Sequence, residues 1–302
     1  MATISVGGAV GEGFSLIRRH PGSVALWALL VWGLLIVRVV LTFPAYSAMF
    51  AEFTRAAGAG AKPDMAAILP QMQQAQALGL LLGFASLFLN TVVICAIYRA
   101  VLRPEQSQFG YLRVGSAELF LFVFTIGAVI AFSIAAVVVA IPLVIIGAVV
   151  GHGSLVGGVT FGVIAGIVAV ICVIYIGLRL SLIGPMMVDD GQFHLGDAWT
   201  LTRGKAGSLF LIGFVLIVLI LVGEVVLASL GFAGIAAAAG GFGQWQALAQ
   251  QPMVLLSRLA PALAIFGLVW LVAVACAMPI LSAPWARAYR DLKQTDLAAT
   301  FG

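Results

Sequence analysis

Two ionisable side chains lie inside long apolar stretches of the sequence, where a charge is expensive. Arg38 follows Gly22 by sixteen residues and Glu224 follows Gly207 by seventeen. On helices these charges lie ~24 Å and ~26 Å beyond the two glycines, at about 1.5 Å per residue. Opposite charges at matching depth relieve one another in a membrane, so we predict an Arg38–Glu224 pair. The alternative is that each side chain extends separately to the lipid headgroups, and a transport or proton-relay role for the pair is a further hypothesis.

Asn90 is the third polar candidate in an apolar stretch. We expect it to form a hydrogen bond between helices, with a contact to a substrate as the alternative. The adjacent Asp189 and Asp190 are interpreted as part of a solvated turn, and a cation site is the alternative. The histidines, His20, His152 and His194, form no HExxH motif.

The remaining chemistry-bearing residue types also form no catalytic or metal pattern. The sequence has no nucleophile elbow and no Walker or Rossmann glycine pattern. The three cysteines, Cys95, Cys172 and Cys276, all lie in apolar stretches without metal-ligand spacing, so we interpret them as packing residues. The sequence therefore predicts a protein that is not an enzyme and has no metal or cofactor.

The composition places most of the chain in lipid. Of the 302 residues, 63% are apolar and only 9% are charged, against roughly 25% charged in soluble domains. A spanning helix needs about 20 mostly apolar residues. Six segments qualify, at 24–48, 77–101, 119–150, 155–182, 208–231 and 259–285. We predict an all-α polytopic membrane bundle of about six transmembrane helices.

The basic residues orient these spans. Eleven of the fifteen lysines and arginines fall on one side: Arg18, Arg19, Arg99, Arg103, Arg113, Arg179, Arg203, Lys205, Arg287, Arg290 and Lys293. Only Arg55, Lys62 and Arg258 fall on the other. Because cytoplasmic loops carry the excess of lysine and arginine, both termini are predicted to be cytoplasmic, in an inner (plasma) membrane. The first apolar run is too long for a cleavable signal peptide.

Two stretches on the opposite side are predicted to lie outside the spans. Residues 50–75, with Pro63, Pro70 and several glutamines, are expected to form an outer loop. Residues 231–257 carry a Gly/Ala-rich start and Trp245. We expect a flexible loop there, and a re-entrant segment is the alternative.

A sequence repeat divides the single membrane domain, 1–302. Residues 11–23 resemble 196–208 at a shift of 185 positions, and both copies lead directly into a span. The repeat predicts parallel units, a lead-in helix plus hairpin at 1–103 and a second copy at 186–302, around a middle hairpin at 104–185. Chance similarity between apolar segments is the alternative.

The lead-in segments have amphipathic patterns. Val6, Val10, Phe14 and Ile17 share one helical face. We expect such a helix to lie at the cytoplasmic membrane interface and to contact membrane lipids, with packing under the bundle as the alternative. The predicted interface residues are Arg18 and Arg19 in the first copy and Trp199 and Arg203 in the second.

Glycines at intervals of four predict close helix packing. Gly158, Gly162 and Gly166 form one row, and Gly79 and Gly83 form another. Such faces let helices approach closely, either within the chain or between subunits.

Several boundary segments resemble a family of bacterial multi-span membrane proteins of uncharacterised function. That family is related to the membrane domain found ahead of some glycerophosphoryl diester phosphodiesterases. The matching segments are Arg103-Pro104-Glu105, Tyr111-Leu112-Arg113, Gly115, Glu118-Leu119, Ala198-Trp199, Leu201-Thr202-Arg203-Gly204, Ala283-Pro284-Trp285 and Ala288-Tyr289-Arg290. In the fused relatives the hydrolase is a separate soluble barrel, for which this sequence has no room. The resemblance therefore implies a link to lipid or envelope biology without the phosphodiesterase activity.

Two classes of function remain open. The preferred interpretation is a non-enzymatic scaffold that interacts with a partner or with lipids, and its partner is either another protein or a second copy in a homo-oligomer. The alternative is a small transporter or lipid-handling protein with a cavity between the repeated hairpins. No nucleic-acid partner is expected.

Overall fold

The computed structural model describes residues 4–153, 155–193, 195–241 and 252–301, and within these ranges it contains helices and no strand. Six helices are long and apolar enough to cross a membrane. They are α2 (Pro21–Gly58), α3 (Met65–Leu102), α4 (Ser116–Gly153), α5 (Leu155–Leu180), α8 (Ala206–Ala238) and α10 (Pro252–Phe301). The prediction of an all-α, multi-pass membrane bundle is confirmed.

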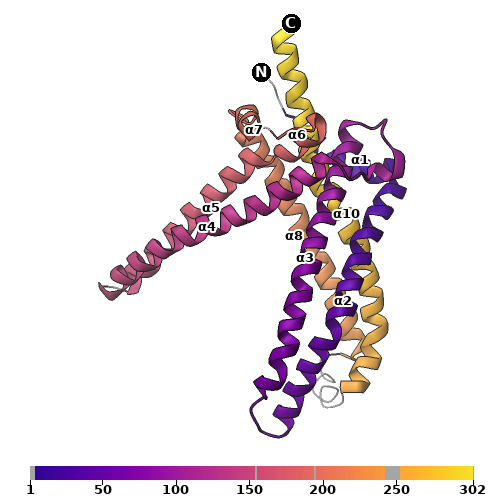
Figure 1. Cartoon of the computed structure of the whole chain (residues 1–302), viewed down its shortest axis with the longest axis vertical. Coiled ribbons are helices and arrows are strands. Elements are labelled where there is room, and N and C mark those ends of the chain that lie inside the picture. The colour runs from indigo at the N-terminus through magenta and orange to yellow at the C-terminus, as the bar shows by residue number, and fades with distance from the viewer. Residues whose placement is uncertain (1–3, 154, 194, 242–251, 302) are drawn as a thin grey trace.

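Four short helices connect the long ones. They are α1 (Val6–Arg19), η1 (Gln108–Tyr111), α6 (Ile183–Asp190) and α7 (Leu195–Leu201). The α2–α3, α4–α5 and α8–α10 hairpins converge where α1, α6 and α7 lie (Figure 1). We call this the closed end of the molecule and the opposite end of the α2–α3 and α8–α10 hairpins the open end.

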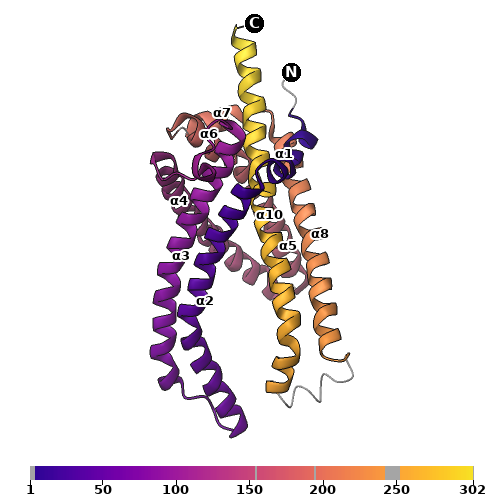
Figure 2. The same cartoon turned by 90° about the vertical axis from the view of Figure 1, so that its right-hand side faces the viewer.

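The three hairpins diverge from the closed end. Toward the open end, α2 and α3 separate from α8 and α10 (Figure 2), and the α4–α5 hairpin extends away from both pairs (Figure 1). Helix α10 is central to the closed end because it packs against α1, α2, α3, α6 and α8. Most of the large buried side chains also lie at this end, among them Trp27, Ile97, Tyr111, Leu182, Met187 and Leu209.

Local sequence explains where α1 ends and α2 begins. The Ser5 hydroxyl accepts a hydrogen bond from the Gly8 N–H at 3.1 Å and caps α1. At the other end, His20 leaves the helical conformation and Pro21 occupies the first turn of α2, where its missing N–H has no cost. The chain therefore turns from α1 into the long apolar helix α2 at a single residue, His20.

The prediction of an outer loop over residues 50–75 is wrong, because the loop is much shorter. Helix α2 continues to Gly58 and α3 begins at Met65, because alanine, glutamine, methionine and leucine favour a helix in water as well as in lipid. The Glu52 carboxylate holds the remaining short loop, because it accepts hydrogen bonds from Arg55 at 2.7 Å and from the Asp64 N–H at 3.1 Å.

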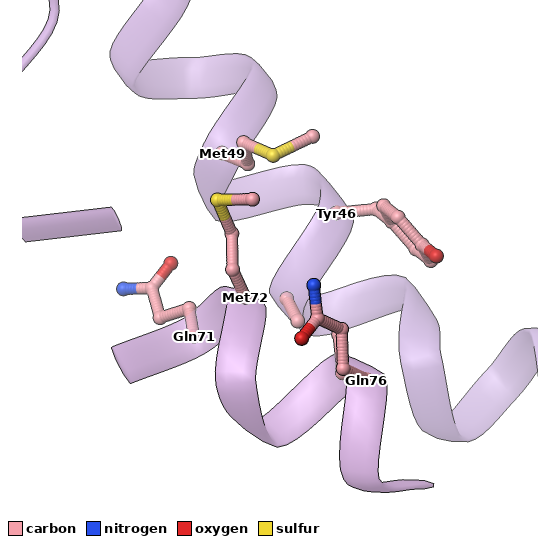
Figure 3. Close-up of a pocket in the computed structure, with 7 residues that line it drawn as sticks. Tyr46, Met49, Gln71, Met72 and Gln76 are labelled. Atoms are coloured by element: carbon pink, nitrogen blue, oxygen red, sulfur yellow. The ribbon is translucent and has the colours of Figure 1, made fainter. Parts of the chain in front are cut away.

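The extended helices enclose a pocket of about 210 Å³ between α2 and α3 near the open end (Figure 3). The side chains of Tyr46, Met49 and Met72 line it together with two glutamines, Gln71 and Gln76. Helix α8 likewise runs on to Ala238, so the first part of the predicted 231–257 loop is helical. Trp245 lies outside the described residues.

Helix α1 packs against the bundle as well as lying at its edge. Its buried face consists of Ala9, Glu12, Gly13 and Leu16. A Cβ on Gly13 would lie 2.6 Å from the Ile280 Cα, so α1 and α10 approach too closely for any side chain at that position. Of the two alternatives for this lead-in segment, packing under the bundle is therefore observed.

Candidate functional site

A cluster of charged side chains joins the three hairpins at the closed end. It has three centres, at the carboxylates of Glu118, Glu12 and Asp189, and each carboxylate pairs with at least one cation from another helix. Its members are Glu12, Arg99, Arg103, Glu118, Asp189, Asp190, Arg287, Arg290, Asp291 and Lys293. We refer to this set as the closed-end cluster.

The most deeply buried centre joins α3 to α4. Arg99 and Glu118 form a salt bridge in which the two side chains are 9% and 1% exposed. The second Glu118 oxygen accepts a hydrogen bond from the Gly115 N–H at 3.0 Å and so caps the start of α4. Arg99 also donates to the Tyr111 carbonyl at 3.0 Å. One ion pair therefore positions the end of α3, η1 and the start of α4.

A left-handed turn at η1 completes this connection. Phe109, Gly110 and Tyr111 have φ values of 49°, 64° and 66°, and left-handed backbone is strained for the two residues that carry side chains. The indole N–H of Trp27 on α2 donates to the Gly110 carbonyl at 2.8 Å. The His20 ring packs edge-on against Tyr111 at 5.6 Å between centroids. These contacts fasten η1 to the start of α2.

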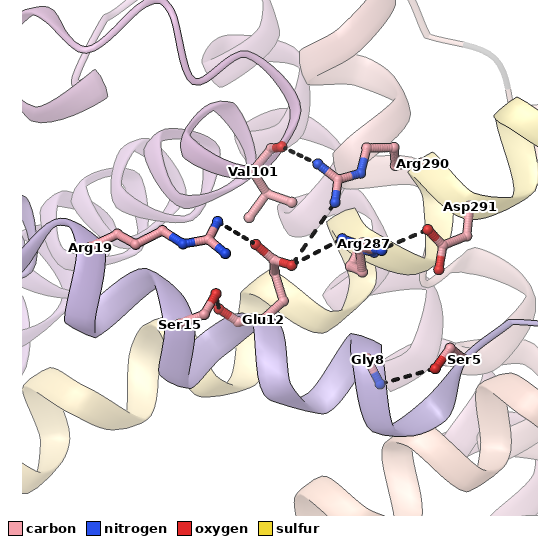
Figure 4. A network of polar contacts seen from close by, with 9 residues as sticks. All are labelled: Ser5, Gly8, Glu12, Ser15, Arg19, Val101, Arg287, Arg290 and Asp291. Atoms are coloured by element: carbon pink, nitrogen blue, oxygen red, sulfur yellow. Dashed lines mark hydrogen bonds and ion pairs between the residues drawn. The ribbon is translucent and has the colours of Figure 1, made fainter.

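The second centre joins α1 to α10 (Figure 4). The Glu12 carboxylate lies 3.3 Å from an Arg287 nitrogen, 3.9 Å from Arg290 and 3.8 Å from Arg19. Arg290 also donates to the Val101 carbonyl at the end of α3 at 3.2 Å, where an unpaired helix carbonyl favours a cation. Glu12 is thus surrounded by cations from two helices.

The third centre joins α6 to α3 and α10. The Asp189 carboxylate accepts hydrogen bonds from Tyr289 at 2.9 Å and Lys293 at 2.5 Å. Arg103 donates to the Asp189 carbonyl, and Lys293 also lies 3.4 Å from Asp190. Asp189 is therefore ion-paired and partly buried, whereas Asp190 is exposed beside Lys293 at the end of α6.

A buried arginine joins α5 to α7 without a carboxylate. The Arg179 guanidinium lies 5.2 Å from the Tyr175 ring centroid and 5.1 Å from that of Trp199. It also donates to the Tyr175 hydroxyl at 2.9 Å and to the Thr202 hydroxyl at 3.4 Å. Cation–π contacts of this kind are worth about 0.5–2 kcal/mol each. Trp199, predicted as an interface residue, is 42% exposed and at the same time part of this contact.

The predicted Arg38–Glu224 pair does not form in this structure. Both side chains are exposed, and the ion pairs of the described residues do not include one between them. Arg38 is on α2 and Glu224 on α8, and α10 packs against both helices. Asn90 donates its hydrogen bond to the Ser86 carbonyl of its own helix at 2.8 Å rather than to a neighbouring helix.

The other predicted site residues divide into two groups. Arg18, Arg19 and Arg203 are exposed at the closed end, and nothing in the structure tests whether they contact lipid. Gly158 permits close approach of α5 to α4, because a Cβ there would lie 2.9 Å from the Gly151 Cα. At Gly162, Gly166, Gly79 and Gly83 a Cβ would meet nothing within 4 Å.

Comparison with protein-family models, with curated proteins and with solved structures finds no match. The site must therefore be interpreted from its own chemistry.

The contacts of the closed-end cluster join helices to one another. In the part of the chain that the structure describes, no three histidine, cysteine or acidic side chains gather in a way that would hold a metal ion. The carboxylates of the closed-end cluster form ion pairs with cations of the same chain. Sequence reasoning missed the roles of Arg99, Glu118 and Arg290, although the spacing of Gly115 and Glu118 is that of a helix cap.

Proposed function

We propose that the protein is a non-enzymatic scaffold whose α4–α5 hairpin binds a transmembrane helix of another subunit. The observation that carries the proposal is the exposure of this hairpin. It projects from the bundle (Figure 1), and none of the described residues in its most apolar stretches is buried. The closed-end cluster fixes only the base of the hairpin, through Glu118.

The surface of the hairpin suits a helix. A groove of about 390 Å³ runs along α4 and α5, and it is lined by Phe124, Gly127, Ala128, Ala131, Phe132, Ala135, Ile176 and Leu180. Gly127, Ala131 and Ala135 follow one another at intervals of four, so they form a row of small residues on one face of α4. Rows of this kind let membrane helices pack backbone to backbone.

We further propose that the closed end faces the cytoplasm of an inner (plasma) membrane, with both termini on that side. Eleven basic residues on that side against three on the other support this orientation. The family resemblance stays a proposal. It rests on the boundary segments of the sequence alone.

Site-specific photo-crosslinking in the native membrane tests the scaffold. We expect a photoreactive residue at Ala131 to give a protein adduct, and the same residue at Ala136 to give far less, because Ala136 is exposed but does not line the groove. An adduct of twice 31.4 kDa would identify a second copy. Ala131→Leu should prevent association and Ala136→Leu should preserve it. Adducts with lipid alone at Ala131 would refute the proposal.

The alternative of a transporter with a cavity between the repeated hairpins lacks its expected lining. Asn90 and Arg38 line neither of the two pockets described above, and Glu224 lines a groove between α8 and α10, which belong to one hairpin rather than two. The scaffold is therefore preferred as the main function.

A further inference from the structure

A groove between α8 and α10 runs through the membrane-spanning part of the molecule. It has a volume of about 390 Å³, and its walls are leucine, isoleucine, valine and alanine side chains. Its end toward the open end is closed by a tight contact, because a Cβ on Gly231 would lie 2.5 Å from the Phe266 ring. At the other end α1 lies across α10, and Phe14 lines the groove there.

The groove contains a single charged residue, Glu224. Gly213 of α8 lies beside the Trp285 ring of α10, at 3.7 Å from a Cβ built on the glycine. Glu224 is eleven residues farther along α8, which is ~16 Å at 1.5 Å per residue. If Trp285 marks the interface, as tryptophan commonly does, this carboxylate lies near the middle of a hydrocarbon layer about 30 Å thick.

Among the residues that the structure describes, none supplies a cation for this carboxylate. No lysine, arginine or histidine of this part of the chain lines the groove, and none of its ion pairs includes Glu224. A charge at this depth is energetically costly when it has no partner. A bound cation would remove that cost.

The other residues that line the groove indicate which kind of cation it would bind. Small inorganic cations such as Mg²⁺ and Ca²⁺ require several oxygen ligands, whereas this groove offers one carboxylate. Trp270 and Phe14 add two aromatic rings, and the Trp270 ring packs against Phe266 at 6.1 Å. Aromatic faces attract organic ammonium groups by cation–π interaction, and aliphatic walls favour an apolar body.

We propose that the α8–α10 groove is a binding site for a lipophilic monovalent organic cation, with Glu224 as its counter-ion and Trp270 and Phe14 packed against its apolar part. This site is separate from the α4–α5 surface of the scaffold, so either proposal can fail without the other.

Binding of methyltriphenylphosphonium to the full chain in lipid nanodiscs tests the site, with empty nanodiscs subtracted. Triphenylphosphine oxide is the matched uncharged probe. We expect saturable binding of the cation and at least tenfold weaker binding of the oxide. Glu224→Gln should weaken binding of the cation by at least tenfold, and Glu105→Gln, an exposed carboxylate at the closed end, should leave it unchanged.

A second variant distinguishes binding inside the groove from a general effect of the Glu224 charge. Ala277→Phe fills the groove without removing Glu224 and should also abolish binding. Absence of saturable binding to the folded wild type, or equal binding to wild type and Glu224→Gln, overturns the proposal.

Discussion

Replacement of Glu118 by glutamine isolates the buried ion pair that positions α4. Glutamine has nearly the shape of glutamate, and its carbonyl oxygen can still accept the hydrogen bond from the Gly115 N–H. The substitution leaves Arg99 with its hydrogen bond to the Tyr111 carbonyl but without its counter-charge. The result is a guanidinium only 9% exposed with no carboxylate beside it.

The expected loss of stability follows from the burial of the Arg99–Glu118 pair. Removing one partner of a buried ion pair typically costs about 3–5 kcal/mol, because the remaining charge is left uncompensated. We expect Glu118→Gln to lower the free energy of unfolding by about 3 kcal/mol or more, since the oxygen of glutamine accepts from the Gly115 N–H and its amide N–H groups, which are donors, then face Arg99. Glu105→Gln is the matched control. Glu105 is exposed, and surface substitutions usually change stability by about 0.5 kcal/mol or less.

Reversible denaturation in mixed detergent micelles measures both variants. The double variant Arg99→Met with Glu118→Gln should be more stable than the sum of the two single losses predicts, because neither charge is then left alone. Hydrogen exchange should show faster opening of the first turns of α4 in Glu118→Gln. A loss below 1 kcal/mol for Glu118→Gln would mean that the pair does not hold α3 to α4, and the reasoning would fail.

Three further substitutions test other parts of the closed end. Glu12→Gln should weaken the attachment of α1 to α10 by about 1–3 kcal/mol, and limited proteolysis should then cleave α1 faster while the rest of the chain stays resistant. Gly13→Ala should lower the unfolding midpoint because its Cβ would lie 2.6 Å from the Ile280 Cα, whereas Gly11→Ala, with nothing within 4 Å, should preserve or raise it. Asp189→Asn should lower the free energy of unfolding by about 1–2 kcal/mol in the same denaturation assay, since it weakens two hydrogen bonds from α10.

The spans could be predicted from the sequence because lipid accepts only long apolar helices. The extensions of α2 beyond residue 48 and of α3 before residue 77 could not. A helix in water needs no apolar run, and Pro70 is an ordinary marker of a loop even though it lies inside α3. The length of a helix inside lipid depends on its run of apolar residues, whereas its extension in water does not. A hydropathy pattern therefore shows only the first of these two lengths.

The site was harder to predict because side-chain pairing depends on direction as well as depth. Arg38 and Glu224 have matching positions along their helices, yet α10 packs against both α2 and α8. The position of a residue along a helix does not indicate on which face of the helix its side chain lies. The pairs that do form, such as Arg99 with Glu118, lie at helix ends, where the sequence shows only a surplus of ordinary boundary charges.

The closed-end cluster also constrains how the molecule can be made. Helix α10 is the last of the described helices in chain order, yet it supplies Arg287, Tyr289, Arg290 and Lys293 to partners on α1, α3 and α6. During synthesis, Glu12 and Asp189 are therefore in place long before the cations of α10 exist. The first five spans can enter the bilayer before α10 is made, with α3 and α4 already joined by Arg99 and Glu118, but Glu12 and Asp189 gain their α10 partners only when the sixth span arrives. Arrest of translation before α10 should therefore leave an inserted, loosely associated chain that membrane proteases recognise.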